Sequence, residues 1–113
     1  SKKNIVGIDI ELLSDRVLKI AHKFTHKEEE KLNLKGDPKI STLILWCAKE
    51  AMYKIFEKRT LSFTENIRLL DFEYNENTQD LSGWINKSGD HINCKGAYFL
   101  LEKFVLVYFI KDQ

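Results

Sequence analysis

The chain has 113 residues, of which 43% are hydrophobic and 31% are charged, and its formal net charge is +1. This length suits one domain, and so large an apolar fraction with so little net charge excludes disorder as the general state. The 18 basic residues are balanced by 17 acidic ones, so the chain lacks the overall positive charge of a nucleic-acid-binding protein, and we expect no nucleic acid partner.

The first predicted element is a strand over residues 4–11, in which apolar residues alternate with glycine and two acids. Successive side chains of a strand point to opposite faces, so Asp9 and Glu11 share one face while Ile8 and Ile10 take the other. Two carboxylates on one face are costly unless they are solvated, paired or bound to a cation. Spacing alone leaves open both a sheet edge that faces water and a cation site.

A helix is predicted next, beginning at Ser14 or Asp15 and running to about Phe24. Apolar residues at spacings of three and four give this helix one buried face. On its other side three basic residues recur at the same spacings: Arg16, Lys19 and Lys23. The spacing alone is typical of a solvated helix surface.

A second short helix is predicted to begin at Thr25, because Thr25 and Glu28 occupy capping-box positions. Gly36 and Pro38 then mark a break over residues 33–39.

The longest predicted helix runs from Ser41 to about Lys58. Its apolar face has spacings of three and four and consists of Ile40, Ile44, Cys47, Ala51 and Ile55. Trp46, Glu50 and Lys54 are spaced four apart and form a row at the margin of that face. Such a row can be held by packing on one side and reach a cleft on the other. An ordinary Glu–Lys pair beside a half-buried Trp has the same spacing.

The second half of the chain is rich in strand and turn signals. Helices in the first half and strands in the second predict an α+β fold, in which the first strand joins an antiparallel-rich sheet packed against the long helix. We expect residues 1–113 to form a single domain. The predicted strands are 67–74, 81–86, 97–101 and 104–110, with turns at 75–80 and 87–90.

Cys47 and Cys94 provide neither a disulfide framework nor the spacing of a zinc site, so we expect both thiols to be reduced and to serve in packing. Nothing in the sequence has the pattern of a signal peptide. The longest apolar stretch, 97–110, is too short and too charged to span a bilayer. We therefore expect a cytoplasmic protein without membrane contact.

Three segments of the chain stand in a particular order. They are Gly7-Ile8-Asp9-Ile10-Glu11, then Phe24-Thr25 with Glu28, and then Trp46-Cys47-Ala48-Lys49-Glu50-Ala51-Met52-Tyr53-Lys54. Together they resemble the motifs of the 4′-phosphopantetheinyl transferases, over about residues 5–56. The resemblance implies transfer of the phosphopantetheine arm of coenzyme A to a serine of a carrier protein, with release of adenosine 3′,5′-bisphosphate.

The resemblance also implies Mg²⁺, a hard cation that offsets the charge of a pyrophosphate under attack. By motif position, Asp9, Glu11 and Glu50 would be the Mg²⁺ ligands, and Glu50 would take the serine proton. Lys54 would stabilise charge on the phosphates, and Lys49 would be a second contact to phosphate or ribose.

The family resemblance assigns partners as well. Arg16, Lys19 and Lys23 would contact the acidic helix of an acyl or peptidyl carrier protein, since short-type members dock it on a basic helix in the corresponding place. The chain resembles either the second half of the surfactin-synthetase-activating type or a compact single-domain member. A complete chain would be expected to form a homo-oligomer with sites between subunits.

Two other functions remain open at this point. One is a module of the same fold that binds coenzyme A or a carrier protein without turnover. The other is a structural or interaction domain whose carboxylates are surface groups.

Overall fold

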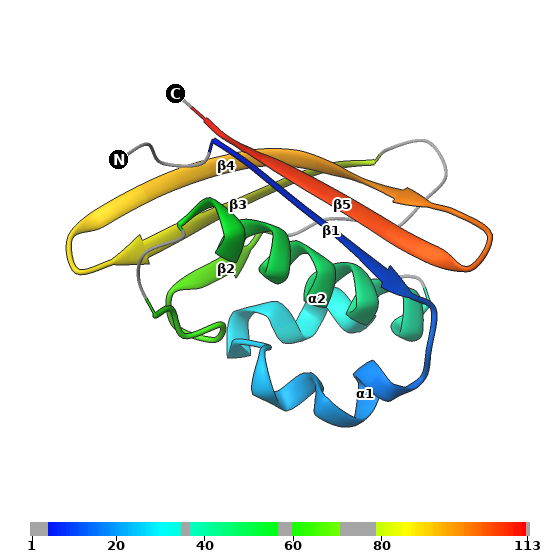
Figure 1. Ribbon diagram of the computed structural model, residues 1–113. Helices are drawn as coiled ribbons and strands as arrows, with labels where there is room; N and C mark the ends of the chain where they lie inside the picture. The colour runs from blue at the N-terminus through cyan, green and yellow to red at the C-terminus, as the bar shows by residue number, and fades with distance from the viewer. Residues whose placement is uncertain (1–4, 35–36, 57–59, 71–78, 113) are drawn as a thin grey trace.

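The structure is a computed structural model that describes residues 5–34, 37–56, 60–70 and 79–112. A five-stranded antiparallel sheet with the order β1-β5-β4-β3-β2 carries the helices on one of its faces (Figure 1). The predicted α+β fold, with the first strand joined to the later ones, is confirmed. In chain order the elements are β1 (Val6–Leu12), α1 (Arg16–Ile20), η1 (Ala21–Lys23), η2 (Lys27–Leu34), α2 (Pro38–Ile55), β2 (Ile67–Leu69), β3 (Asp80–Lys87), β4 (Asp90–Leu100) and β5 (Phe104–Lys111).

The edge strand β1 has two faces of different character. Gly7 and Asp9 are buried beneath α2, whereas Ile8 and Ile10 on the opposite face are 53% and 51% exposed. The alternation predicted from the sequence is therefore present. The carboxylates lie on the covered side of the strand, and the apolar side chains lie on the open side.

Helix α2 crosses β1 at Gly7. A Cβ atom at this position would lie 1.8 Å from the carbonyl oxygen of Ala51, so only a residue without a side chain permits the approach. The Cys47 thiol, one turn earlier on α2, donates a hydrogen bond to the Asp9 carbonyl oxygen at 3.2 Å. The small residues at this crossing thus set the distance between the strand and the helix.

Helix α2 begins earlier than the sequence pattern predicted. The side chain of Asp37 accepts a hydrogen bond from the Lys39 amide at 2.9 Å, and Pro38 occupies the first turn, where its missing N–H costs nothing. Pro38 is therefore the start of the helix and not part of the break before it. The helix ends at Ile55, and the predicted end near Lys58 lies outside the described residues.

The first predicted helix is divided into the α-helix α1 and the 3-10 turn η1. The predicted cap at Thr25 is wrong, because its hydroxyl is buried without a hydrogen-bond partner. The capping bonds lie one residue later in the chain. The His26 amide donates to Glu29 Oε1 at 2.8 Å, and the Glu28 amide donates to His26 Nδ1 at 2.9 Å.

The predicted turn at 87–90 is confirmed by the hairpin between β3 and β4. Ser88 and Gly89 both have positive φ, at 52° and 89°, as a two-residue type I′ turn requires. The predicted strand at 67–74 is observed as β2. Residues 71–74 of that prediction, and 75–78 of the turn after it, lie outside the described residues.

The two cysteines are free and buried, as predicted. Burial raises the pKa of the Cys94 thiol to about 12, and it raises the pKa of Cys47 still further above its ordinary value. No described helix combines the length and the apolarity that crossing a membrane requires.

Candidate active site

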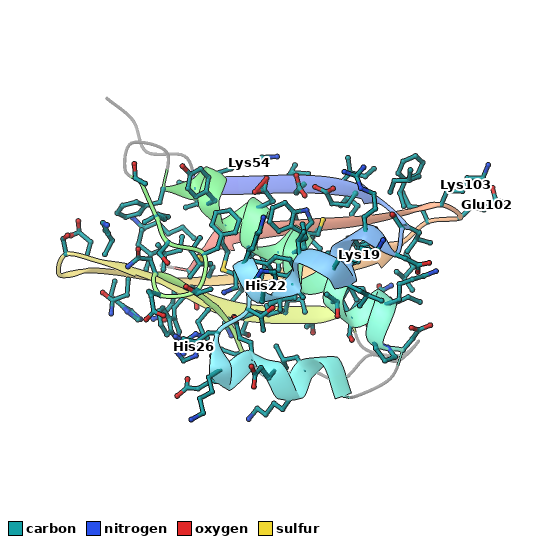
Figure 2. All side chains as sticks on the ribbon, turned by 90° about the horizontal axis from the view of Figure 1, so that it is seen from below. Lys19, His22, His26, Lys54, Glu102 and Lys103 are labelled. Atoms are coloured by element: carbon teal, nitrogen blue, oxygen red, sulfur yellow. The ribbon has the colours of Figure 1, made fainter. Side chains whose placement is uncertain are left out.

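Asp9 and Lys54 meet where α2 crosses β1. Figure 2 shows Lys54 beside this strand. The Lys54 ammonium lies 3.1 Å from Asp9 Oδ1 and donates a second hydrogen bond to the Ile8 carbonyl oxygen at 2.8 Å. The Lys54 side chain is 49% exposed, whereas that of Asp9 is only 9% exposed. The strand motif and the helix motif, far apart in the sequence, therefore form one site at the edge of the sheet.

Two further carboxyl groups, those of Glu11 and Glu50, lie near this pair. Burial, together with the hydrogen bond and charge of Asp9, raises the pKa of Glu11 to about 7, while a hydrogen bond from Trp46 opposes the rise. Burial and the Asp9 charge also raise the pKa of Glu50, against the influence of Lys54. Asp9 Oδ2 is buried without a hydrogen-bond partner. An orphaned carboxylate oxygen among like charges favours a bound cation.

The chemistry of these groups fits Mg²⁺, which prefers carboxylate, phosphate and water oxygens. Within the described ranges, however, no three or more His, Cys, Asp and Glu side chains are already arranged around a common metal position. Asp9 is held in place by packing, whereas Glu11 and Glu50 are only partly buried. A three-carboxylate site would therefore need side-chain rotation of these two residues.

Trp46 packs in a cluster of aromatic rings beside the carboxylates. Its ring centroid lies 5.0 Å from that of Phe24 and 5.7 Å from that of Phe63. Trp46 and Glu11 both line a hollow of about 340 Å³, and Arg16 lies at the same hollow. Trp46 and Glu50 are half-buried and Lys54 is exposed, so the row lies at the margin of the core as the helical spacing indicated.

Lys49 lies apart from these residues, in the core. Its side chain is 0% exposed, and its ammonium lies 2.8 Å from Glu29 Oε1. The same ammonium donates to the carbonyl oxygens of Phe63 and of Ile67, the latter at 2.6 Å. Burial lowers the pKa of Lys49 to about 8, against the attraction of Glu29. The expected contact of Lys49 with phosphate or ribose finds no support in this position, because no surface of the side chain faces solvent.

The basic residues of the first helical segment are all exposed. Arg16 and Lys19 belong to α1, and Lys19 is visible on it in Figure 2. Lys23 belongs to η1, where the tighter 3-10 geometry changes the spacing on which the sequence prediction relied. Among the three, Arg16 is the one that lines the hollow beside Glu11.

Sequence reasoning did not find Glu29 or Phe63. Glu29 lies in a run of three glutamates, and nothing in such a run shows which carboxylate turns into the core. Phe63 follows the helix motif by several residues and belongs to no periodic pattern. Only the tertiary contacts with Lys49 and Trp46 reveal their place.

Comparison with known families agrees with the geometry. A model of the 4'-phosphopantetheinyl transferase superfamily matches residues 5–104. No curated protein matches the chain by sequence. The match covers the strand, the helix and most of the sheet, and the chain belongs to the 4′-phosphopantetheinyl transferase superfamily. Membership supports a phosphopantetheine-transferase type of function and implies interaction with coenzyme A and a carrier protein.

Proposed function

We propose that this chain, as one domain over residues 1–113, transfers the 4′-phosphopantetheine arm of coenzyme A to a serine of an acyl or peptidyl carrier protein in a Mg²⁺-dependent reaction. The observation that carries the proposal is the crossing of α2 over β1. It brings the Lys54 ammonium of the helix motif to 3.1 Å from Asp9 of the strand motif.

The chain's own residues have complementary tasks in this reaction. Asp9, Glu11 and Glu50 would hold Mg²⁺, which when bound offsets the negative charge of the pyrophosphate. Glu50 is partly exposed and its pKa is raised, so its carboxylate suits the removal of a proton from the serine hydroxyl. Lys54 carries its charge on a long, half-exposed side chain, which can reach a phosphate and stabilise it in the transition state.

The carrier protein docks on the exposed basic residues Arg16, Lys19 and Lys23. Arg16 lies at the hollow that also borders Glu11, so a carrier helix placed along α1 would present its serine next to the carboxylates. Charges on such a rim act mainly on the rate of encounter. The basic surface therefore serves recognition of an acidic partner.

The sheet supports self-association through its uncovered face. Lys95 of β4 pairs with Ile110 and lies on this face. The apolar part of the open face consists of Val6, Ile8, Ile10 and Leu12 of β1, Phe99 of β4, and Phe104, Leu106, Tyr108 and Ile110 of β5. Seven of these nine residues are between 39% and 56% exposed, and none of the nine is charged. All described helices lie on the other side of the sheet (Figure 1).

A second copy of this chain is the partner that the open face fits. Its apolar side chains expose on the order of 700 Å², which exceeds the largest patch of a typical monomer and approaches the share of one partner in a standard interface. The apolar part of the face requires no complementary charge from its partner, so it can pack against itself around a two-fold axis. Self-association through this face would make the chain a homo-oligomer, with the carboxylates of β1 on the side of the sheet away from the interface.

A transfer assay tests the proposed reaction. With coenzyme A, Mg²⁺ and an apo carrier protein, Asp9→Asn, Glu50→Gln and Lys54→Met should each lower turnover by about 10²-fold or more. Glu102→Gln and Lys103→Met, at the tip of the β4–β5 hairpin, are matched controls and should keep wild-type turnover (Figure 2). Near-normal Mg²⁺-dependent transfer by Glu50→Gln would contradict the assignment.

A single-turnover experiment separates catalysis from binding alone. If the wild-type chain binds coenzyme A but transfers nothing to any of several apo carrier proteins in a single turnover, the chain is a binding module of the same fold. Modification of the carrier serine, detected by mass spectrometry, supports the enzyme.

A further inference from the structure

The buried ion pair of Lys49 and Glu29 is satisfied on both sides. Each of the three N–H groups of Lys49 has a protein acceptor: Glu29 Oε1, the Phe63 carbonyl and the Ile67 carbonyl. Glu29 is 1% exposed, and it also accepts hydrogen bonds from the His26 amide at 2.8 Å and the Leu69 amide at 2.7 Å. The pair thereby joins η2, α2, β2 and the segment that precedes β2.

Such a pair contributes little net stability. Removing two charges from water costs about as much as their attraction and hydrogen bonds return, and replacement of a buried pair by apolar residues is often neutral or stabilising. Its remaining physical effect is to fix geometry, because the charges bind particular backbone groups and no others.

The contacts lead from Lys49 to the candidate active site. Lys49 binds the carbonyl oxygen of Phe63, and the Phe63 ring packs 5.7 Å from Trp46 and 5.3 Å from Tyr53, centroid to centroid. Trp46 is thereby enclosed between Phe63 and Phe24. Trp46 also lines the hollow that it shares with Glu11.

We infer that Lys49 is a positioning residue, which holds Phe63 against Trp46 and so fixes the Trp46 indole beside Glu11. This inference rests on the proposed function only in naming Glu11 as part of the site. Lys49 stands next to Glu50 in the helix motif, yet it acts through the core and not on a ligand. Without Lys49 the Phe63 backbone is no longer tied to α2, and Trp46 loses one of the two rings that hold its orientation.

The experiment removes the ion pair while keeping the core filled. The double variant Lys49→Met/Glu29→Leu replaces both charges by apolar groups of similar size, in a Trp84→Phe background that leaves Trp46 as the remaining tryptophan. Thermal unfolding measures stability, acrylamide quenching measures access to Trp46, and steady-state kinetics separate kcat from KM. Ile92→Val, a buried change on β4 outside the ring contacts of Trp46, is the control for a simple loss of stability.

The double variant is expected to melt below the wild-type temperature, because the His26 and Leu69 amides and the Phe63 and Ile67 carbonyls lose their partners. Its Trp46 quenching constant rises at least about twofold, and its kcat falls by about tenfold, with KM for coenzyme A nearly unchanged, since misplaced groups cost rate more than binding. Ile92→Val should lower the melting temperature and leave quenching and kcat as they are. Phe63→Leu, which removes the ring and keeps the ion pair, should reproduce the rise in quenching.

Unchanged Trp46 quenching in a folded double variant overturns the inference. If the double variant does not fold, Glu29→Gln weakens the pair with little change of shape, and unchanged quenching in that variant overturns the inference equally. A rise in quenching in a protein without any transfer activity upholds the positioning role and contradicts the proposed function instead.

Discussion

Glu11 couples the stability of the metal-free protein to pH. Its pKa is raised from an ordinary 4.5 to about 7, first by burial and then by Asp9. A carboxyl group with a raised folded-state pKa adds stability that is complete below pH 4.5 and is lost as the pH rises through about 7. The negative charges of Asp9 and Glu50 also favour the protonated form of Glu11. Lys54 opposes the corresponding rise in the pKa of Glu50.

We therefore expect the melting temperature of the wild type in a chelator to fall between about pH 5 and pH 7 more than that of Glu11→Gln. The glutamine side chain at position 11 stays uncharged throughout this range, so it contributes no loss of stability as the pH rises. Melting curves of both proteins at several pH values measure the difference, and Glu102→Gln serves as an exposed carboxylate control. Parallel pH profiles for wild type and Glu11→Gln would mean that Glu11 does not take up a proton in the folded state.

At the scale of single residues, the sequence predicted some roles better than others. Asp9 and Lys54 could be predicted to share a site, because the motif order fixes which strand and helix carry them. Lys49 belongs to the same helix motif as Lys54. Its partner Glu29 lies on another element, however, and no local sequence pattern shows that this element packs against Lys49. Burial is decided by tertiary packing, so a motif position alone does not separate a ligand contact from a core ion pair.

Among the elements, the contact between β1 and α2 depends on one glycine. Gly7→Ala places a methyl group against the backbone of Ala51, which cannot move aside as a side chain can. We expect a loss of at least about 2 kcal/mol in the free energy of unfolding, together with loss of transfer. Urea denaturation measures the first effect. Gly89→Asn, in open space at a positive φ that Asn tolerates, should cost far less.

Wild-type stability in Gly7→Ala would contradict so close a crossing of α2 over β1. A destabilised variant that still transfers at the wild-type rate would show that the crossing serves folding and not the site.

The basic surface of α1 can be tested by charge reversal. Arg16→Glu with Lys19→Glu should raise KM for the carrier protein at low ionic strength and leave KM for coenzyme A unchanged, and the effect should fade with added salt. Lys27→Glu with Lys31→Glu makes the same change in net charge at exposed positions elsewhere. Equal effects of the two pairs would indicate that net charge matters and that docking does not involve α1.

Element boundaries were predicted less well than element types, for physical reasons that differ from case to case. Asp37 and Pro38 are a helix start signal, but Gly36 beside them makes the same segment typical of a break. The cap at His26 uses an imidazole nitrogen, which ranks below the hydroxyl of Thr25 in any sequence rule. The early part of β4 is rich in polar residues and glycine, so pairing with β3 and not local propensity makes it a strand.

For the molecule as a whole, the open face makes a prediction about assembly. We expect wild-type protein at micromolar concentrations to sediment as a dimer and Ile10→Lys to sediment as a folded monomer, because a charge at the centre of an apolar interface is left without a partner. Leu70→Lys introduces the same charge at an exposed apolar residue outside the open face, and it should leave the dimer intact. Sedimentation velocity over a range of concentrations measures both.

A wild-type chain that stays monomeric at all concentrations would contradict a second copy as the occupant of the open face. If the wild type forms a species larger than a dimer and Ile10→Lys also disrupts it, the open face is still the interface but the symmetry of the assembly differs.

The alternation along β1 has a consequence for how this strand tolerates change in length. Its odd residues turn toward α2 with the acidic groups, and its even residues turn outward with the apolar ones. Inserting or deleting one residue before Asp9 would exchange the two sets, placing isoleucines under the helix and carboxylates on the open face. Both the candidate active site and the open face would then be lost. The Ser88–Gly89 turn serves neither surface, so length changes should be accepted there and excluded from β1.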